Sequence, residues 1–435
     1  MTASYAPGIA TAAQPQQDDQ PVAGGVQFLG GERDYWPLLA RGAVLLMITL
    51  GIYRFWLVTD MRRFLWPNTE VAGHTLEYNG TACELLIGFL AAIAILLPFN
   101  VAFFIAAFGL GGEWISVFAF LFLVALSQFA VYRARRYRLT RTVYRGIRFH
   151  QTGSALAYAA RASAWWIAFV LTFGLTYPWA KADLERFKLK NTYYGTLPGR
   201  FEGAALPLFL RGLAMWLIVM GPLMASVVAA LSVVDWPGVM AIPPRRFTEA
   251  DLTATGLMHG AALVATGLAW AVTAAASLYP AFQAMTLRWW LSGLRFGPIE
   301  AISYLRTGQI YRAYLRFLRY AAIFTVLAIT LLFLGFATLG LIMAWIFPDL
   351  WTRTTTGSAL AAETMGVISA IGSYVFTVLG LSAIHQVVVK LGLLRLAVET
   401  LALSNVDALA NVKAVGRPAS PVGEGLADAL HVGGF

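Results

Sequence analysis

A motif that recurs along the chain constrains its architecture more than any other feature of the sequence. One copy lies in residues 49–80 and another in residues 172–203. In both copies a Thr is followed after seven residues by a Trp, after seven more by an Arg, and after a further seventeen by a Gly. The positions are Thr49, Trp56, Arg63 and Gly80 in the first copy and Thr172, Trp179, Arg186 and Gly203 in the second. Such self-similarity indicates one supersecondary unit used repeatedly.

Two less complete copies extend the pattern. One keeps the spacing of seventeen from Arg136 to Gly153, and the other keeps the spacing of nine from Tyr279 to Arg288 that Tyr177 and Arg186 also show. Residues 1–27 are rich in Ala, Pro, Gln and Gly and contain no Lys or Arg, which is typical of disorder. The sequence therefore predicts a disordered tail (1–27), a first repeat unit with a helical hairpin (28–161), a second unit (162–255), a third, eroded unit (256–398) and a cytoplasmic tail (399–435).

Long charge-free apolar runs place the chain in a membrane. Hydrophobic residues make up 59% of it, charged residues only 12%, and the mean hydropathy is +0.66. A spanning helix needs roughly 20 apolar residues. Runs that approach or exceed this length are 85–110, 115–132, 212–234, one ending near Leu287, 320–347 and 367–389. We therefore expect an all-α polytopic membrane protein with about six crossing helices.

Two further apolar segments, 42–53 and 162–180, are expected not to cross. The first is only about 18 Å long as a helix, and the second lies between two strongly basic stretches. Because basic loops stay in the cytoplasm, both segments are interpreted as re-entrant or interfacial helices that return to the cytoplasmic side. Both termini are then cytoplasmic. The alternative is eight ordinary spans with a violated charge rule.

Three stretches between the helices mix β-formers with turn residues. They are residues 62–80, 142–153 and 191–203. We read them as small β-hairpin ribbons on the cytoplasmic side, which pair into one small sheet, with residues 291–296 as a further candidate member. Independent irregular loops are the alternative. The expected fold remains all-α, with these ribbons as additions to it.

The charge of the chain bears on its partners. The net charge is +10, carried mainly by Arg, and the sequence pI is about 9.8. Basic residues that flank membrane spans follow the positive-inside rule and attract anionic headgroups, so we expect membrane lipids as partners and no nucleic acid. A homo-oligomer or an unknown protein partner stays open.

The chain resembles the YjgN-like family of bacterial inner-membrane proteins, which is a domain of unknown function. The resemblance covers roughly residues 26–430. It rests on residues 49–53 with Trp56, on residues 177–181, on Asn191-Thr192, on Arg-Phe pairs at 148, 200 and 295, and on residues 423–428. It implies a multi-pass protein of the inner membrane, and it supplies no activity and no catalytic residues.

The sequence contains few groups that point to chemistry. It shows no zinc-binding His pattern, no phosphate-binding Gly-Lys-Ser/Thr loop and no nucleophile elbow, so we expect no enzyme, no catalytic residue, no cofactor and no metal. His259, His385 and Asn100 lie inside expected spans, where polar groups are candidates for function or bond to a neighbouring helix. Residues interpreted as lipid anchors are Trp56, Arg63, Trp179, Arg186 and Arg288.

Two classes of function remain. The first is a transporter or channel-like protein for a small solute, which predicts that His259, His385 and Asn100 converge on one cavity. The second is a non-catalytic envelope or lipid-organising scaffold, which predicts dispersed polar groups and a broad basic cytoplasmic face. The sequence slightly favours transport.

Overall fold

Short strands from distant parts of the chain close into a β-barrel. The computed structural model describes residues 24–109, 113–242, 248–346, 359–415 and 422–430. Within these residues the barrel is antiparallel, and each strand pairs with its neighbours in sequence, while β1 also pairs with β10. The strands are β1 (Gly24–Phe28), β2 (Thr69–Val71), β3 (His74–Tyr78), β4 (Thr142–Tyr144), β5 (Ile147–Gln151), β6 (Thr192–Tyr194), β7 (Leu197–Phe201), β8 (Leu294–Phe296), β9 (Ile299–Ser303) and β10 (Leu401–Ser404).

The barrel corrects the fold class expected from the sequence. Strands do occur in the three stretches that mix β-formers and turn residues, but the protein is not all-α, and the strands are not separate hairpin ribbons. The physical reason is closure. Strands β1 and β10, which the sequence did not reveal, pair with each other and with β2 and β9, so that no edge strand is left unpaired.

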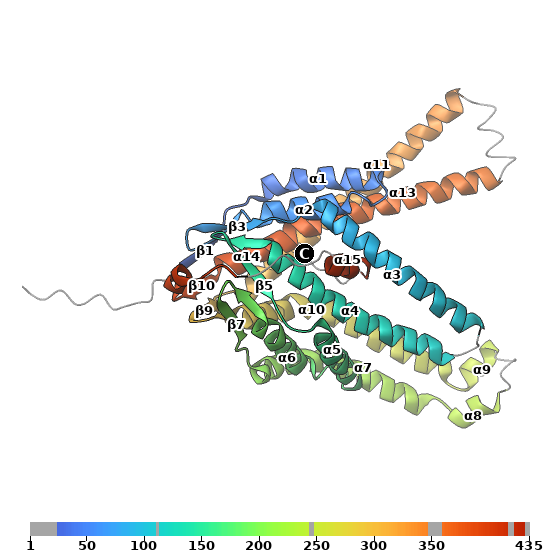
Figure 1. The fold of residues 1–435 in the computed structure, drawn as a ribbon. Helices are drawn as coiled ribbons and strands as arrows, with labels where there is room; N and C mark the ends of the chain where they lie inside the picture. The colour runs from blue at the N-terminus through green and yellow to red at the C-terminus, as the bar shows by residue number, and fades with distance from the viewer. Residues whose placement is uncertain (1–23, 110–112, 243–247, 347–358, 416–421, 431–435) are drawn as a thin grey trace, which may run out of the picture.

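Six long helices project from the barrel, all toward the same end of the molecule (Figure 1). They are α3 (Ala82–Gly109), α4 (Glu113–Arg141), α7 (Ala205–Val233), α10 (Leu257–Ser292), α11 (Thr307–Ile346) and α13 (Ala359–His385). Of the described residues, six helices are long and apolar enough to cross a membrane, which confirms the six predicted runs. Residues 1–23 of the expected disordered tail (1–27) lie outside the described residues, whereas residues 24–27 belong to strand β1, which corrects that part of the prediction.

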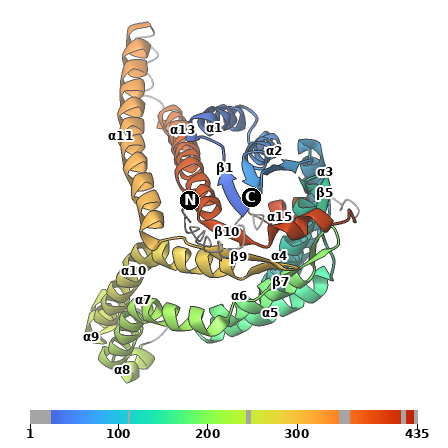
Figure 2. The same cartoon turned by 90° about the vertical axis from the view of Figure 1, so that its left-hand side faces the viewer.

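Two shorter helical pairs complete the ring around the barrel (Figure 2). Helices α1 (Glu32–Ile48) and α2 (Arg54–Leu65) form one pair, and α5 (Ala155–Leu171) and α6 (Tyr177–Lys190) form the other. Each described strand pair β1/β2, β3/β4, β5/β6, β7/β8 and β9/β10 thus encloses a helical pair, and we call these five segments βααβ units. The smaller elements are α8 (Trp236–Ala241), α9 (Glu249–Ala254), a π-helix (Gln386–Leu391), α14 (Gly392–Glu399), a 3₁₀ helix (Val406–Asn411) and α15 (Val422–Ala429).

The recurring Thr reverses the chain at the tip of each short pair. Thr49 Oγ1 donates to Leu45 O at 2.7 Å and accepts from Tyr53 N at 3.0 Å, which ends α1 and positions α2. Gly51 follows with a φ of +93°, a conformation that favours glycine. Thr172 makes the same bonds to Ala168 O and from Thr176 N. The segments 42–53 and 162–180 therefore turn back, while their place relative to the bilayer stays a prediction.

Apolar side chains fill the barrel, and polar ones cover it. Phe149 on β5 contacts Phe296 on β8, with ring centroids 6.3 Å apart, although two strands lie between them in the wall. Such a contact has to cross the interior. On the outer face, Arg295 pairs with Glu300 at 3.8 Å. This pattern is the reverse of a lipid-facing barrel and is typical of a barrel in water.

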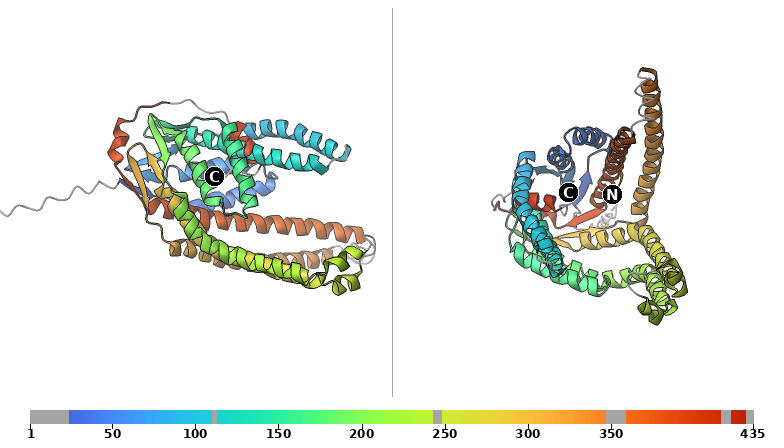
Figure 3. Two further views of the ribbon diagram at one scale, coloured as in Figure 1. Left: turned by 90° about the horizontal axis from the view of Figure 1, so that it is seen from below. Right: turned by 90° about the vertical axis from the view of Figure 1, so that its right-hand side faces the viewer.

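The pairs of long helices are splayed apart from one another, while α7 packs along α10 within its pair (Figure 3). In five of the six helices, only 6–17% of the most apolar 18-residue stretch is buried inside the protein. In the sixth candidate span, 369–399, the buried share reaches 39%, because the end of this span packs against apolar residues of β1, α1 and α2. Most of the apolar surface of these helices therefore faces outward.

A substitution in the two-residue turn between β4 and β5 provides a test of the barrel. Gly146 has a φ of +75°, and a Cβ there would meet nothing within 4 Å, so a substitution is opposed by backbone strain alone. We expect Gly146→Ala to lower stability by about 1–2 kcal/mol, measured by thermal unfolding in detergent. Gly308→Ala, which also meets nothing within 4 Å but has no positive φ, is the control. An equal effect of the two substitutions would contradict the turn.

Candidate functional site: a buried charged layer

Charged side chains form a layer where the helices meet the barrel. They come from the last turns of α2, α4 and α6 and from α15. Among the described residues, four cations and two carboxylates make up this buried charged layer. They are Arg62, Arg135, Arg138, Lys188, Glu185 and Glu424.

The neighbouring arginines of the repeated motif fix the same helix ends. Arg63 donates to Gly80 O at 3.1 Å, and Arg186 donates to Gly203 O at 3.0 Å. Arg136 makes the corresponding bond to Gly153 O. Arg288 donates to Leu305 O, again seventeen residues further along the chain, at 3.4 Å. Each bond joins the end of one helix to the residues just before the next helix, and a β-hairpin connects the two helices. The spacing of seventeen is therefore the length of that connection.

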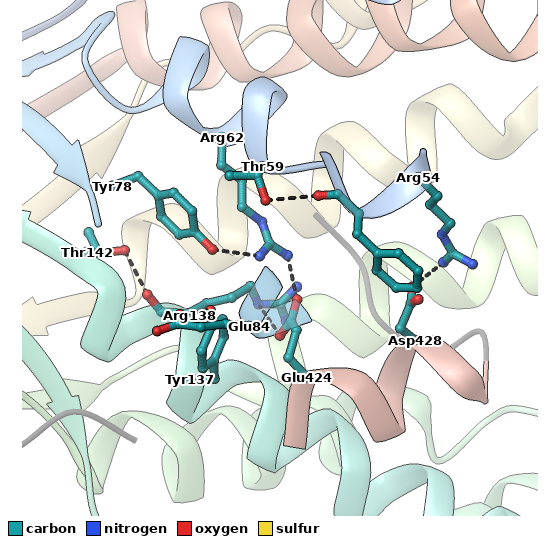
Figure 4. A network of polar contacts seen from close by, with 11 residues as sticks. Arg54, Thr59, Arg62, Tyr78, Glu84, Tyr137, Arg138, Thr142, Glu424 and Asp428 are labelled. Atoms are coloured by element: carbon teal, nitrogen blue, oxygen red, sulfur yellow. Dashed lines mark hydrogen bonds and ion pairs between the residues drawn. The ribbon is translucent and has the colours of Figure 1, made fainter. Parts of the chain in front are cut away.

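Arg62 lies at the centre of the layer (Figure 4). Its side chain is almost fully buried, with Nη2 2.5 Å from Glu424 Oε1 and Nη1 donating to the Tyr78 hydroxyl at 2.9 Å. Burial alone lowers the pKa of Arg62, but Glu424 and Tyr78 oppose this and raise it overall. Arg138 Nε lies 3.9 Å from the other carboxylate oxygen of Glu424. Both oxygens of Glu424 thus face a guanidinium.

Glu424 comes from the C-terminal helix α15, which packs between α3 and α4. A Cβ on Gly425 would lie 1.8 Å from the carbonyl carbon of Gly88, so only glycine permits this helix crossing. Ala427 is fully buried in a small apolar core with residues of α3 and α4. Asp428 adds an ion pair with Arg54. The C-terminal segment is therefore a structural element of the helical ring.

A second part of the layer surrounds Glu185 on α6. This carboxylate is 2% exposed and accepts from Lys188 Nζ at 2.5 Å and from the Trp290 indole at 3.1 Å. Burial raises the pKa of Glu185, but Lys188 and Lys181 outweigh it and hold the pKa at about 2. For Lys188, burial lowers the pKa to about 8, against the attraction of Glu185.

The chemistry of the layer suits either the binding of a ligand or the positioning of the helices around it. Its cations outnumber its carboxylates, which suits an anion. No group of three or more His, Cys, Asp or Glu that could hold a metal ion occurs among the described residues. The arrangement can hold helix ends and α15 in place through charge-assisted hydrogen bonds.

The intramembrane candidates from the sequence do not come together. Asn100 is exposed on α3 and donates to Leu96 O of its own helix at 2.9 Å. His259 is exposed near the start of α10. His385 ends α13, with its ring 5.4 Å from that of Phe317. The three residues lie on three different helices and line none of the cavities described below.

The residues interpreted as lipid anchors have identifiable contacts. Arg63, Arg186 and Arg288 make the backbone bonds described above. Trp56 stacks on Tyr53 with ring centroids 6.3 Å apart, and Trp179 packs on Phe209 at 4.7 Å while staying 39% exposed. Their contact with lipid stays a prediction.

Sequence reasoning missed the layer itself. Arg62 and Glu185 each directly precede an arginine of the motif, so their side chains leave the helix about 100° away from that arginine, which was a usable signal. Glu424 belongs to the 423–428 pattern noted above, but nothing in the sequence showed that this segment folds back onto α2 and α4.

Comparison with known proteins identifies a family. A family model described as a bacterial protein of unknown function (DUF898) matches residues 23–429. The resemblance to YjgN fits this match, since YjgN is a member of that family. No curated protein and no solved structure matches the chain.

The central ion pair can be tested by a double-mutant cycle. Because either single change leaves a buried charge without its partner, we expect Arg62→Met and Glu424→Leu each to cost about 3–5 kcal/mol. The double variant should lose less than the sum of the two. Thermal unfolding in detergent measures each loss. The control is Arg395→Gln, in an exposed pair with Glu399, with an expected loss below about 1 kcal/mol. Additive losses would contradict the coupling.

Lys188 predicts an unusual pH dependence. Its pKa falls from 10.5 in the unfolded chain to about 8 in the folded protein, so between these values the unfolded state binds more protons. Stability should therefore rise from pH 8 to pH 10.5, by roughly 1–3 kcal/mol. The measurement is the difference in melting temperature between the wild type and Lys188→Met across this range. A constant difference would show that Lys188 stays charged.

Proposed function

Because the chain belongs to the bacterial DUF898 family, whose function is unknown, its role has to be inferred from its structure, and we propose that it is a non-catalytic, lipid-organising scaffold of the inner membrane. In this proposal the barrel lies in the cytoplasm and both termini are cytoplasmic. The helical pairs extend from the barrel into the bilayer.

The low burial of the long helices carries this proposal. In five of the six candidate spans, protein buries only 6–17% of the most apolar 18-residue stretch, so lipid is the natural covering for the rest. A protein that holds its spans apart arranges the lipids between them. The barrel-side ends of the helices, which are fixed by the arginine bonds and the buried charged layer, set the distance between the pairs.

Exposed basic residues occur along the barrel-side part of the helices. They flank the barrel ends of α2, α6 and α11, where the headgroups of the cytoplasmic leaflet would lie. They are Arg63, Arg186, Lys190, Arg306, Arg312 and Arg319. This is the broad basic face that a lipid-organising protein requires.

The tips of the short helical pairs support contact with the leaflet as well. Leu50 is 93% exposed at the first tip, and Phe173 is 61% exposed at the second. Such side chains are costly in water and favourable in the acyl region. In this proposal the pairs α1/α2 and α5/α6 enter only the cytoplasmic leaflet.

Transport of a small anionic solute is the second candidate. The excess of cations in the buried charged layer favours it. Against it stand the aromatic filling of the barrel and the separation of His259, His385 and Asn100. Flux through proteoliposomes separates the two functions.

Lipid retention tests the scaffold function. We expect the purified protein to retain phosphatidylglycerol in preference to phosphatidylcholine, counted by native mass spectrometry. Replacing Arg306, Arg312 and Arg319 together by Gln should reduce the retained anionic lipid several-fold. The control replaces Arg148 and Arg200, which lie on barrel strands, by Gln. Equal retention by both variants, or solute flux above that of empty vesicles, would contradict the proposal.

Cysteine labelling tests the topology. In a Cys83→Ala background, an impermeant thiol reagent added outside should label Thr248→Cys, at the N-cap of α9, and not Thr196→Cys, in the β6–β7 turn. Leu50→Cys should stay unlabelled from either side, because its tip lies in lipid. External labelling of Thr196→Cys would place the barrel outside, and labelling of Leu50→Cys would place that tip in water.

A further inference from the structure

We propose that two adjoining cavities beside the α5/α6 pair bind the two acyl chains of one anionic phospholipid. The proposal rests on the lipid-organising function and assigns it a specific site. The larger cavity lies where the turn between α5 and α6 faces α7 and α10, and the smaller cavity lies between α5 and α6. These helices lie on one side of the ring (Figure 2).

The larger cavity has the size and surface of an acyl-chain site. Its volume is about 480 Å³, within the range of roughly 300–1,000 Å³ that small-molecule sites occupy. Its walls are almost wholly apolar or aromatic, and it lies between the turn that ends α5 and the facing sides of two long helices. Residues that line it include Phe173, Leu213, Met215, Trp216, Leu278 and Phe282.

A smaller cavity adjoins the larger one. Its volume is about 230 Å³, and it lies between α5 and α6. Phe169 and Tyr177 line both cavities. Two adjoining apolar cavities that share two aromatic side chains suit the two chains of a diacyl lipid, which diverge from one glycerol.

A positively charged side chain also lines the smaller cavity. Lys181 lines it, with a side chain that is 38% exposed and a Nζ that lies 3.4 Å from Glu185 Oε1. Glu185 already accepts from Lys188 and Trp290, so Lys181 keeps charge available for a phosphate. Lys181 is also one turn nearer the barrel than Tyr177. The headgroup would thus face the cytoplasmic side while the chains run into the bilayer.

The walls are held in place before any lipid binds. The Trp216 indole donates to Phe173 O at 2.8 Å, which ties the hairpin tip to α7. Tyr177 packs on Phe282 of α10 with ring centroids 5.5 Å apart. A preformed site loses little ordering entropy on binding, which favours one defined lipid over loosely exchanging ones.

Filling the larger cavity provides the test. Gly212 and Ala275 line it from two helices, and the nearest contact of a Cβ on Gly212 is an ordinary 3.7 Å. The probe is phosphatidylglycerol with a diazirine at the end of one chain, in nanodiscs with the full-length protein. We expect cross-links at Met215, Met220 and Phe282, reduced at least fivefold in Gly212→Phe and in Ala275→Phe. Gly221→Phe on α7, where a Cβ meets nothing within 4 Å, should leave them unchanged.

The headgroup is tested separately. Lys181→Gln should abolish the preference for phosphatidylglycerol over phosphatidylcholine in cross-linking at these residues and leave the cross-linked positions the same. The melting temperature of each variant shows that it is folded. Since Ala275→Phe changes a different helix from Gly212→Phe, loss of fold in one variant leaves the other as the test.

The outcomes separate this site from the broader function. Cross-links that spread evenly over α3, α7 and α11, or that persist in both filled variants, would overturn the cavity proposal while leaving lipid organisation intact. Displacement of the probe by a co-purified apolar peptide would assign the cavities to a protein partner and overturn it too. Absence of cross-links on the whole protein would overturn both proposals.

Discussion

The pairing of the first strand with the last is the interaction on which the rest of the structure depends. Gly24 pairs with Leu403, which joins the first and the last strand into one closed wall. Only a closed wall gives each βααβ unit a fixed neighbour on both sides. The helical pairs inherit their positions from the strands, because the arginine bonds tie each helix end to the strand pair beside it. The splay between the helical pairs is thus set in the barrel and not by contacts between pairs in the apolar region, where little surface is buried.

The buried charged layer adds specificity to this frame. Two charges taken out of water gain little net stability from each other, so the Arg62–Glu424 pair is best understood as fixing which segment occupies the position of α15. An apolar helix could pack against α3 and α4 in several registers. A carboxylate that has to meet Arg62 and Arg138 at once allows one register, and the contact between Gly425 and Gly88 selects the same one.

The sequence was a good guide where a physical signal is long and a poor one where it is short. Helices such as α3 and α7 follow from uninterrupted apolar runs, because length alone distinguishes a span. Strands of three residues, such as β2 and β8, carry too little alternation to be recognised, and β10 is the apolar Leu-Ala-Leu-Ser with no period of two. The spacing of seventeen was visible, but its meaning required the bond from Arg63 to Gly80. Arg62 and Glu185 look like solvated charges because burial at a junction of helices from distant segments leaves no local pattern.

Closure between β1 and β10 also sets the order of events during synthesis. The barrel has no complete wall until residue 404 has left the ribosome, by which time every candidate span has already been made. On the topology proposed above, the helical pairs enter the bilayer one after another while the strands between them stay on the cytoplasmic side with unpaired edges. On that topology the barrel closes only after the last candidate span has been made, and until then its strands are exposed to chaperones and to pairing with the wrong chain.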